Sequence, residues 1–178
     1  MKEKPYYSIT LYKGRILTLK KKFIYLPNQE IAMREIVEHQ GGVGVLAIND
    51  NNEILLIEQY RAALEKPLLE IPAGLLEEGE NPKQCARREL REETGYDAKN
   101  FRFLGKYYPS PGFSNEVIHL FLATELFYNP LEMDKDEFLK VKLLPVNEAI
   151  DFIYDLDPVD AKTAIAILRY FYQFNIKP

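Results

Sequence analysis

Residues 74–96 read GLLEEGENPKQCARRELREETGY, a stretch with clear signals for the start and the end of a helix. Asn81 can act as the N-cap of a helix. Pro82 suits the first helical position, where a backbone N–H has no intrahelical partner. Gly95 suits the left-handed conformation that commonly ends a helix. The stretch therefore predicts a helix from about Pro82 to Thr94.

The faces of this helix separate at about 100° per residue. One stripe should pack on the body of the protein: Ala86, Leu90 and Thr94. Glu89 and Glu93 lie side by side, and Glu92 falls on their flank. Like charges at this spacing repel by roughly 0.2–0.5 kcal/mol per exposed pair. The glutamates therefore form either a solvated acidic face or a set of oxygen ligands for a hard cation such as Mg²⁺.

Eight positions of this stretch match the Nudix box, G-x5-E-x7-R-E-U-x-E-E-x-G-U, in which U is apolar. The matching residues are Gly74, Glu80, Arg88, Glu89, Leu90, Glu92, Glu93 and Gly95. Tyr96 fills the last apolar position as a variant. The chain thus resembles the Nudix hydrolases, which favours the cation site over the solvated face. The resemblance implies an α/β (α+β) fold, the Nudix α/β/α sandwich with a mixed sheet.

Length and composition limit the classes of protein to which the chain can belong. With 178 residues, 47% of them hydrophobic, the chain can form one domain with a small appendage. The net charge of −4 predicts no broad basic surface for nucleic acid. The one cysteine, Cys85, excludes an intrachain disulfide and is expected to be a small apolar filler. With no signal peptide expected and no apolar run of membrane-spanning length, we expect a cytoplasmic protein without a membrane partner.

Strands are expected wherever β-branched and aromatic residues alternate with polar ones. These segments are residues 6–12, 15–26, 31–39, 43–48, 53–60, 68–72, 101–108, 116–126 and 141–146. Two further helices are expected at residues 147–156 and 161–174. Gly41 and Gly42 mark a boundary between an N-terminal β-strand dimerisation region, residues 1–40, and a Nudix hydrolase domain, residues 41–178. The first region should form a small antiparallel β appendage.

Several segments outside the box resemble the ADP-ribose pyrophosphatase branch of the family. They are EQYR at 58–61, LLEIPAG at 68–74, SPGFSNE at 110–116, DKDEF at 134–138 and DAKT at 160–163. Pro111 lies sixteen residues after Gly95, as the marker proline of that branch does. The resemblance implies Mg²⁺-dependent hydrolysis of ADP-ribose to AMP and ribose 5-phosphate, with Mn²⁺ as a possible substitute.

Two alternatives remain open. One is the same chemistry on GDP-mannose or another nucleotide sugar. The other is a non-catalytic, Nudix-like regulatory module that binds nucleotides. Such modules commonly lose box glutamates, whereas this chain keeps them all.

The resemblance also implies roles for individual acidic residues. The metal ligands would be the carbonyl of Ala73 and the carboxylates of Glu89, Glu92, Glu93 and Glu137. Glu92 and Glu93 also belong to the expected catalytic group. The branch often has a glutamate where this chain has Lys135, so the identity of the general base stays open. Glu137 is a loop carboxylate able to reach metal or water, and Asp136 or Asp134 could take the base role.

Other box residues are expected to support these ligands. Arg88 should orient the box carboxylates, and Glu80 should tie the preceding loop to the helix. Gly74 and Gly95 are expected to serve the backbone conformation.

Candidate substrate contacts are Arg61, Arg34, Glu116, Phe23 and Tyr25. The arginines could bind phosphate or ribose oxygens, since a guanidinium binds anionic oxygens bidentately. A surface salt bridge is the alternative for Arg61, and a solvated charge is the alternative for Glu116. Phe23 or Tyr25 could stack on adenine or could pack across strands. Branch members exchange their N-terminal strands between subunits, so a homodimer is expected.

Overall fold

The computed structural model describes residues 2–133, 137–156 and 158–174. Contacts divide the chain into two compact units. The N-terminal unit comprises residues 1–41 and 108–117, and the main unit comprises residues 42–107 and 118–178.

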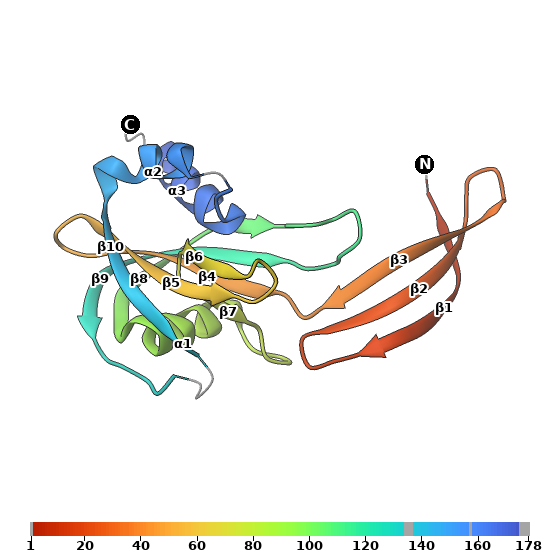
Figure 1. Ribbon diagram of the computed structural model, residues 1–178, viewed down its shortest axis with the longest axis horizontal. Coiled ribbons are helices and arrows are strands. Elements are labelled where there is room, and N and C mark those ends of the chain that lie inside the picture. The colour runs from red at the N-terminus through yellow and green to blue at the C-terminus, as the bar shows by residue number, and fades with distance from the viewer. Residues whose placement is uncertain (1, 134–136, 157, 175–178) are drawn as a thin grey trace. The chain divides into compact units, whose positions relative to one another are not determined.

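The N-terminal unit is a three-stranded antiparallel sheet, as the alternating pattern predicts (Figure 1). Its strands are β1 (Lys4–Lys13), β2 (Leu17–Tyr25) and β3 (Ile31–His39), in that order across the sheet. The 108–117 segment joins β3 through a bridge between Val37 and Ser114. All ten residues of β1 are exposed, which leaves an unusual number of large apolar side chains in contact with solvent.

The main unit is built on a seven-stranded mixed sheet. Its strands are β4 (Gly42–Ile48), β5 (Glu53–Arg61), β6 (Lys66–Glu70), β7 (Ala73–Leu75), β8 (Tyr96–Tyr107), β9 (Ile118–Tyr128) and β10 (Leu139–Pro145). The central order is β10-β5-β4-β9-β8, with β6 beside β5 and β7 beside β4. The β4–β9 pair is parallel and the other pairs are antiparallel, which confirms the predicted mixed sheet.

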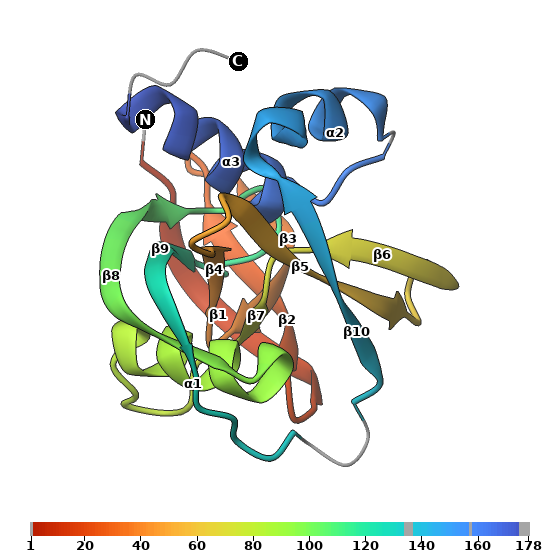
Figure 2. The ribbon, with the colours of Figure 1, turned by 90° about the vertical axis from the view of Figure 1, so that its left-hand side faces the viewer.

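Helices cover both faces of this sheet, as expected for an α/β/α sandwich (Figure 2). One face carries α1 (Pro82–Thr94), and the other carries α2 (Ala149–Asp155) and α3 (Ala161–Gln173). A short 3₁₀ helix, Val146–Glu148, precedes α2. Alternate residues of β4 serve the two cores, with Val45 facing α1 and Leu46 facing α3. This explains why β4 is apolar at almost every position.

Helix α1 begins and ends at the predicted residues because its signals are local. The Asn81 side chain accepts a hydrogen bond from the backbone N–H of Lys83 at 2.9 Å. Gly95 has a φ of 78° and its N–H donates to the carbonyl of Arg91. Ala86 and Leu90 are fully buried, as their stripe predicts. Complete burial of a leucine side chain contributes about 1.5–3 kcal/mol.

Strand β8 differs from its predicted bounds, since it begins at Tyr96 rather than near residue 101. Its first residues include the buried Asp97, a residue type that is unfavourable in strands. Arg87 of α1 compensates this carboxylate at 3.2 Å, and the N–H of Ala98 donates to it at 2.7 Å. A partner on a separate element therefore permits a strand that local composition does not indicate.

Candidate active site

The box carboxylates are held against the short strand β7. The backbone N–H of Ala73 donates to Oε2 of Glu93 at 2.8 Å. The next residue, Gly74, lies against the carboxyl group of Glu89, where an added Cβ would stand only 2.0 Å from Oε1. Position 74 therefore requires glycine because the carboxyl group of Glu89 fills the space that a Cβ would occupy. Gly95, in contrast, serves the backbone conformation as expected. Strand β7 and helix α1 together position two glutamates.

Arg88 connects the remaining box residues. Its Nη1 donates to Glu89 at 2.7 Å and to Glu92 at 3.0 Å. Its Nε and Nη2 donate to the two carboxylate oxygens of Glu80, each at 3.1 Å. Glu80 also accepts from the N–H of Glu77, so it ties the loop to the helix. These are the contacts expected of an arginine that orients neighbouring carboxylates.

Two of the three helix glutamates are buried, which decides against a solvated acidic face. Glu89 is 8% exposed and Glu93 is 4% exposed. Burial, together with the charges of Glu92 and Glu137, raises the pKa of Glu89 to about 7 against the opposing effect of Arg88. Burial also raises the pKa of Glu93 well above its usual range. Buried carboxylates of this kind normally have a compensating cation or metal.

Glu137 approaches the same group from the loop before β10, since its charge raises the pKa of both Glu89 and Glu93. Asp134, Lys135 and Asp136 lie outside the described residues.

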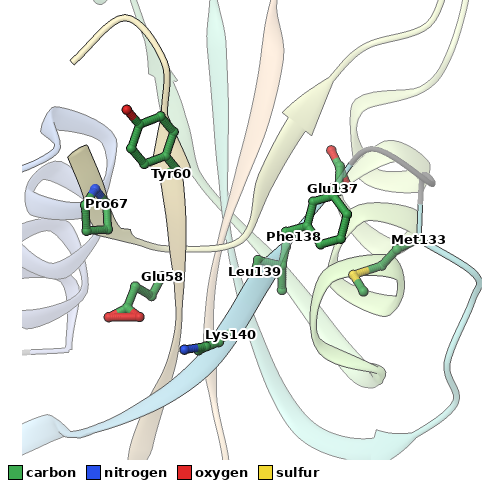
Figure 3. Close-up of a pocket in the computed structure, with 8 residues that line it drawn as sticks. All are labelled: Glu58, Tyr60, Pro67, Met133, Glu137, Phe138, Leu139 and Lys140. Atoms are coloured by element: carbon green, nitrogen blue, oxygen red, sulfur yellow. The ribbon is translucent and has the colours of Figure 1, made fainter. Parts of the chain in front are cut away.

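Glu137 also lines an open pocket of about 400 Å³ (Figure 3). The lining residues are Glu58, Tyr60, Pro67, Met133, Glu137, Phe138, Leu139 and Lys140. Space for a ligand therefore lies beside the loop carboxylate.

Arg61 lies at the end of β5 and contacts a residue to which sequence reasoning assigned no role. Its Nε and Nη2 donate to Glu70 at 2.5 and 2.9 Å. Glu70 is 1% exposed and also accepts from Lys162 of α3. The available signal was a charged residue inside the apolar run LLEIP, because a buried carboxylate requires partners.

The other predicted substrate residues belong to the N-terminal unit. Arg34 pairs with Glu3 at 2.9 Å. Glu116 lies 3.7 Å from Nδ1 of His39. The remaining two candidates are aromatic: the Phe23 ring stacks on Tyr7 at 4.3 Å, and the Tyr25 ring lies 5.0 Å from that of Tyr6. Both aromatic candidates thus make the cross-strand contacts that were the alternative to adenine stacking.

The donor chemistry of the main unit suits a hard divalent cation, since the grouped side chains offer carboxylate oxygens. Within the described ranges, however, no three His, Cys, Asp or Glu side chains already stand in metal-binding geometry. Arg88 holds Glu89 and Glu92, and the N–H of Ala73 holds Glu93. Each of these bonds occupies one carboxylate oxygen, so the second oxygen of each glutamate can serve a cation while the bond is kept.

Cys85 is the buried filler expected from sequence. Its Sγ contacts the carbonyl of Leu75 at 3.3 Å, and burial raises the pKa of its thiol. A thiol in this environment is a poor nucleophile. Within the described part of the chain, no helix is long and apolar enough to cross a membrane.

A family model and several known proteins match most of the chain. The model of the NUDIX domain matches residues 38–166. The chain is 41% identical to an ADP-ribose pyrophosphatase of Bacillus subtilis, over 94% of this chain and 91% of the relative. It is 43% identical to a methanol dehydrogenase activator of Bacillus methanolicus, over 88% of this chain and 86% of the relative.

Two further comparisons widen the range of relatives. A GDP-mannose pyrophosphatase of Yersinia enterocolitica is 37% identical, over 78% of this chain and 76% of the relative. A crystal structure described as an ADP compounds hydrolase superposes with a TM-score of 0.88, covering 98% of this chain and 95% of that one. Its sequence identity is 24%, so this last match supports the fold alone.

Proposed function

Because the chain belongs to the Nudix hydrolase family, we propose that it hydrolyses the pyrophosphate linkage of ADP-ribose to AMP and ribose 5-phosphate. The observation that carries this proposal is the burial of Glu89 and Glu93 against β7, because the charged forms of two buried carboxyl groups call for a bound cation. The choice of ADP-ribose is supported by a relative of that specificity that aligns with 94% of the chain.

Members of this family generally use divalent metal ions, and we propose Mg²⁺ here, with Mn²⁺ as a substitute. The proposed ligands are the Ala73 carbonyl and the carboxylates of Glu89, Glu92, Glu93 and Glu137. When bound, the cation supplies positive charge to the pyrophosphate oxygens and assists the loss of a proton from water.

The chain's own residues have separate tasks in the proposed reaction. Glu137 accepts a proton from the attacking water, with Asp136 or Asp134 as the alternative base. Arg88 keeps Glu89 and Glu92 oriented through the hydrogen bonds described above. Positioned charges of this kind supply most of the acceleration in phosphoryl chemistry.

Substrate contacts are proposed for five side chains. Arg61 donates to phosphate oxygens of the substrate. Arg34, Glu116, Phe23 and Tyr25 are proposed to contact the ribose or adenine. We expect no nucleic-acid partner because the net charge is −4. We also propose a cytoplasmic location, where the one cysteine stays reduced.

We further propose a homodimer that exchanges its N-terminal strands, residues 1–40. Support comes from the exposed apolar side chains of β1, which are Tyr6, Tyr7, Ile9, Leu11 and Tyr12. A patch of this kind commonly marks a protein interface. Light scattering should give twice the 20.7 kDa mass of the chain, and a stable monomer at micromolar concentration would exclude the dimer.

A second candidate substrate is GDP-mannose, because one relative at 37% identity carries that specificity. The test is a panel of ADP-ribose, GDP-mannose, NADH and diadenosine polyphosphates, each with Mg²⁺ and with products separated by anion-exchange chromatography. We expect the highest kcat/KM for ADP-ribose, with AMP and ribose 5-phosphate in equal amounts. A higher kcat/KM for GDP-mannose would replace the proposed substrate.

A further inference from the structure

Glu70 is a buried carboxylate with two cationic partners from distant parts of the chain. Arg61 comes from β5, nine residues away, and Lys162 comes from the first turn of α3, 92 residues away. Both cations are at least partly buried, with side chains 37% and 13% exposed. Burial alone would raise the pKa of Glu70, but the hydrogen bonds and charges of the two cations outweigh it and the net shift is downward. Glu70 is therefore held in the charged form.

The first turn of α3 fixes this arrangement. Asp160, the N-cap of α3, accepts from the backbone N–H of Thr163 at 2.9 Å and from Nζ of Lys162 at 3.1 Å. The hydroxyl of Thr163 in turn accepts from the backbone N–H of Ile71 at 2.9 Å. Both the side chain of Glu70 and the backbone of the next residue are thus fastened to one helix end.

The same short segment reaches the box carboxylates. Glu70 holds Arg61, and three residues later the N–H of Ala73 holds Glu93. Residues 70–73 therefore set the guanidinium of Arg61 and the carboxylate of Glu93 relative to one another. The opposite charges of Arg61 and Glu93 attract, which partly opposes the burial that raises the pKa of Glu93. The pKa of Arg61 is raised mainly by its hydrogen bond to Glu70, and the charge of Glu93 adds to that rise.

The geometry leaves Arg61 suited to an anion. Glu70 engages Nε and Nη2, which form one edge of the planar guanidinium. A guanidinium has five donors, so its other edge can serve a second acceptor. Arg61 and Lys162 together balance the charges of Glu70 and Asp160, so the cluster has no excess positive charge. Arg61 can therefore serve a phosphate group through the N–H donors on the second edge of its guanidinium.

We propose that Glu70, with Lys162 as its second cation, is a positioning residue that directs Arg61 at the pyrophosphate of the substrate. This inference rests on the proposed function, in which Arg61 binds phosphate. It assigns a task to Lys162, in the DAKT segment at the start of α3. The alternative is that Glu70 serves stability alone.

The test is a double-mutant cycle of Glu70→Gln, Arg61→Met and the double variant, assayed for KM and kcat on ADP-ribose. If Glu70 acts through Arg61, Glu70→Gln raises KM about tenfold, and in the double variant it adds nothing to the effect of Arg61→Met. Lys162→Met also raises KM. Lys162→Arg, which keeps the positive charge, leaves KM close to the wild-type value. Independent effects that multiply in the double variant would overturn the inference.

Asp97→Asn is the matched control for lost stability. Asp97 is also a buried carboxylate, 4% exposed and paired with the arginine Arg87. This variant should lower Tm as Glu70→Gln does while leaving KM within about twofold of wild type. If both variants changed KM equally, the effect of Glu70 would be structural and the inference would fail.

The dissociation constant (Kd) of ADP-ribose is also measured for the same variants, by calorimetry in EDTA, which removes divalent cations and so prevents turnover. If the wild type turns over ADP-ribose but the Glu70→Gln and Arg61→Met substitutions show no coupling in KM or Kd, the positioning role is refuted and the proposed function stands. Tight binding without turnover, with coupling in Kd, refutes the proposed reaction and supports the positioning role. ADP-ribose that neither binds nor turns over refutes both.

Discussion

The contact between Gly74 and Glu89 gives a sharp test of the site. In Gly74→Ala, the new Cβ would lie 2.0 Å from Oε1 of Glu89, whereas ordinary contact begins at 3.4 Å. The carboxylate must therefore retreat by at least about 1.4 Å, a displacement that can cost about 10²-fold in rate when it misplaces a reacting group. The displaced atoms are the end of a flexible side chain, so the backbone need not move.

We therefore expect kcat/KM on ADP-ribose to fall by about 10²-fold while Tm falls by less than about 4 °C, the shift that corresponds to about 1 kcal/mol in a domain of this size. AMP release measured by chromatography and thermal unfolding measured by circular dichroism provide the two readouts.

Gly79→Ala is the matched control for a box glycine. Gly79 has a φ of 78°, and an added Cβ there meets no atom within 4 Å. The variant should lose about 1–2 kcal/mol through backbone strain and keep kcat/KM within about threefold of wild type. Gly74→Ala with near wild-type kcat/KM would refute the steric explanation of the box glycine.

Three further predictions concern the general base, a helix cap and the response to pH. Glu137→Gln should lower kcat more than Lys135→Ala does, and the opposite order would reassign the base. Asn81→Ala should destabilise the protein by about 1 kcal/mol in urea unfolding, because the N-cap of α1 is lost. Since the pKa of Glu70 is lowered from 4.5, its contribution is present above pH 4.5 and is lost as pH falls through the folded pKa. The difference in unfolding free energy between wild type and Glu70→Gln should therefore shrink below pH 4.5, and a constant difference would contradict the ionised pair.

Local signals explain what sequence predicted well. The bounds of α1 follow from Asn81 and Gly95, which act within one turn of the helix ends. The fixed spacing of the box likewise indicates that Glu89, Glu92 and Glu93 share one side of a helix. The apolar run of β4 indicates a strand buried on both faces, which the structure confirms.

Long-range partners explain what sequence did not predict. The bond between Glu70 and Lys162 spans 92 residues, so no local pattern indicates it. The early start of β8 depends on Arg87 of another element, which compensates Asp97. The role of Gly74 was also missed, because its cause is a side chain fifteen residues later, Glu89, rather than a backbone angle.

The proposed function requires that the buried box carboxylates hold the cation on which the reaction depends. Its most direct test is kcat on ADP-ribose with Mg²⁺ for Glu93→Gln beside Glu78→Gln, the same change at an exposed glutamate of the box. We predict that Glu93→Gln lowers kcat by about 10²-fold or more with the fold intact, and that Glu78→Gln stays within about twofold of wild type. Equal kcat values for the two folded variants would contradict the claim.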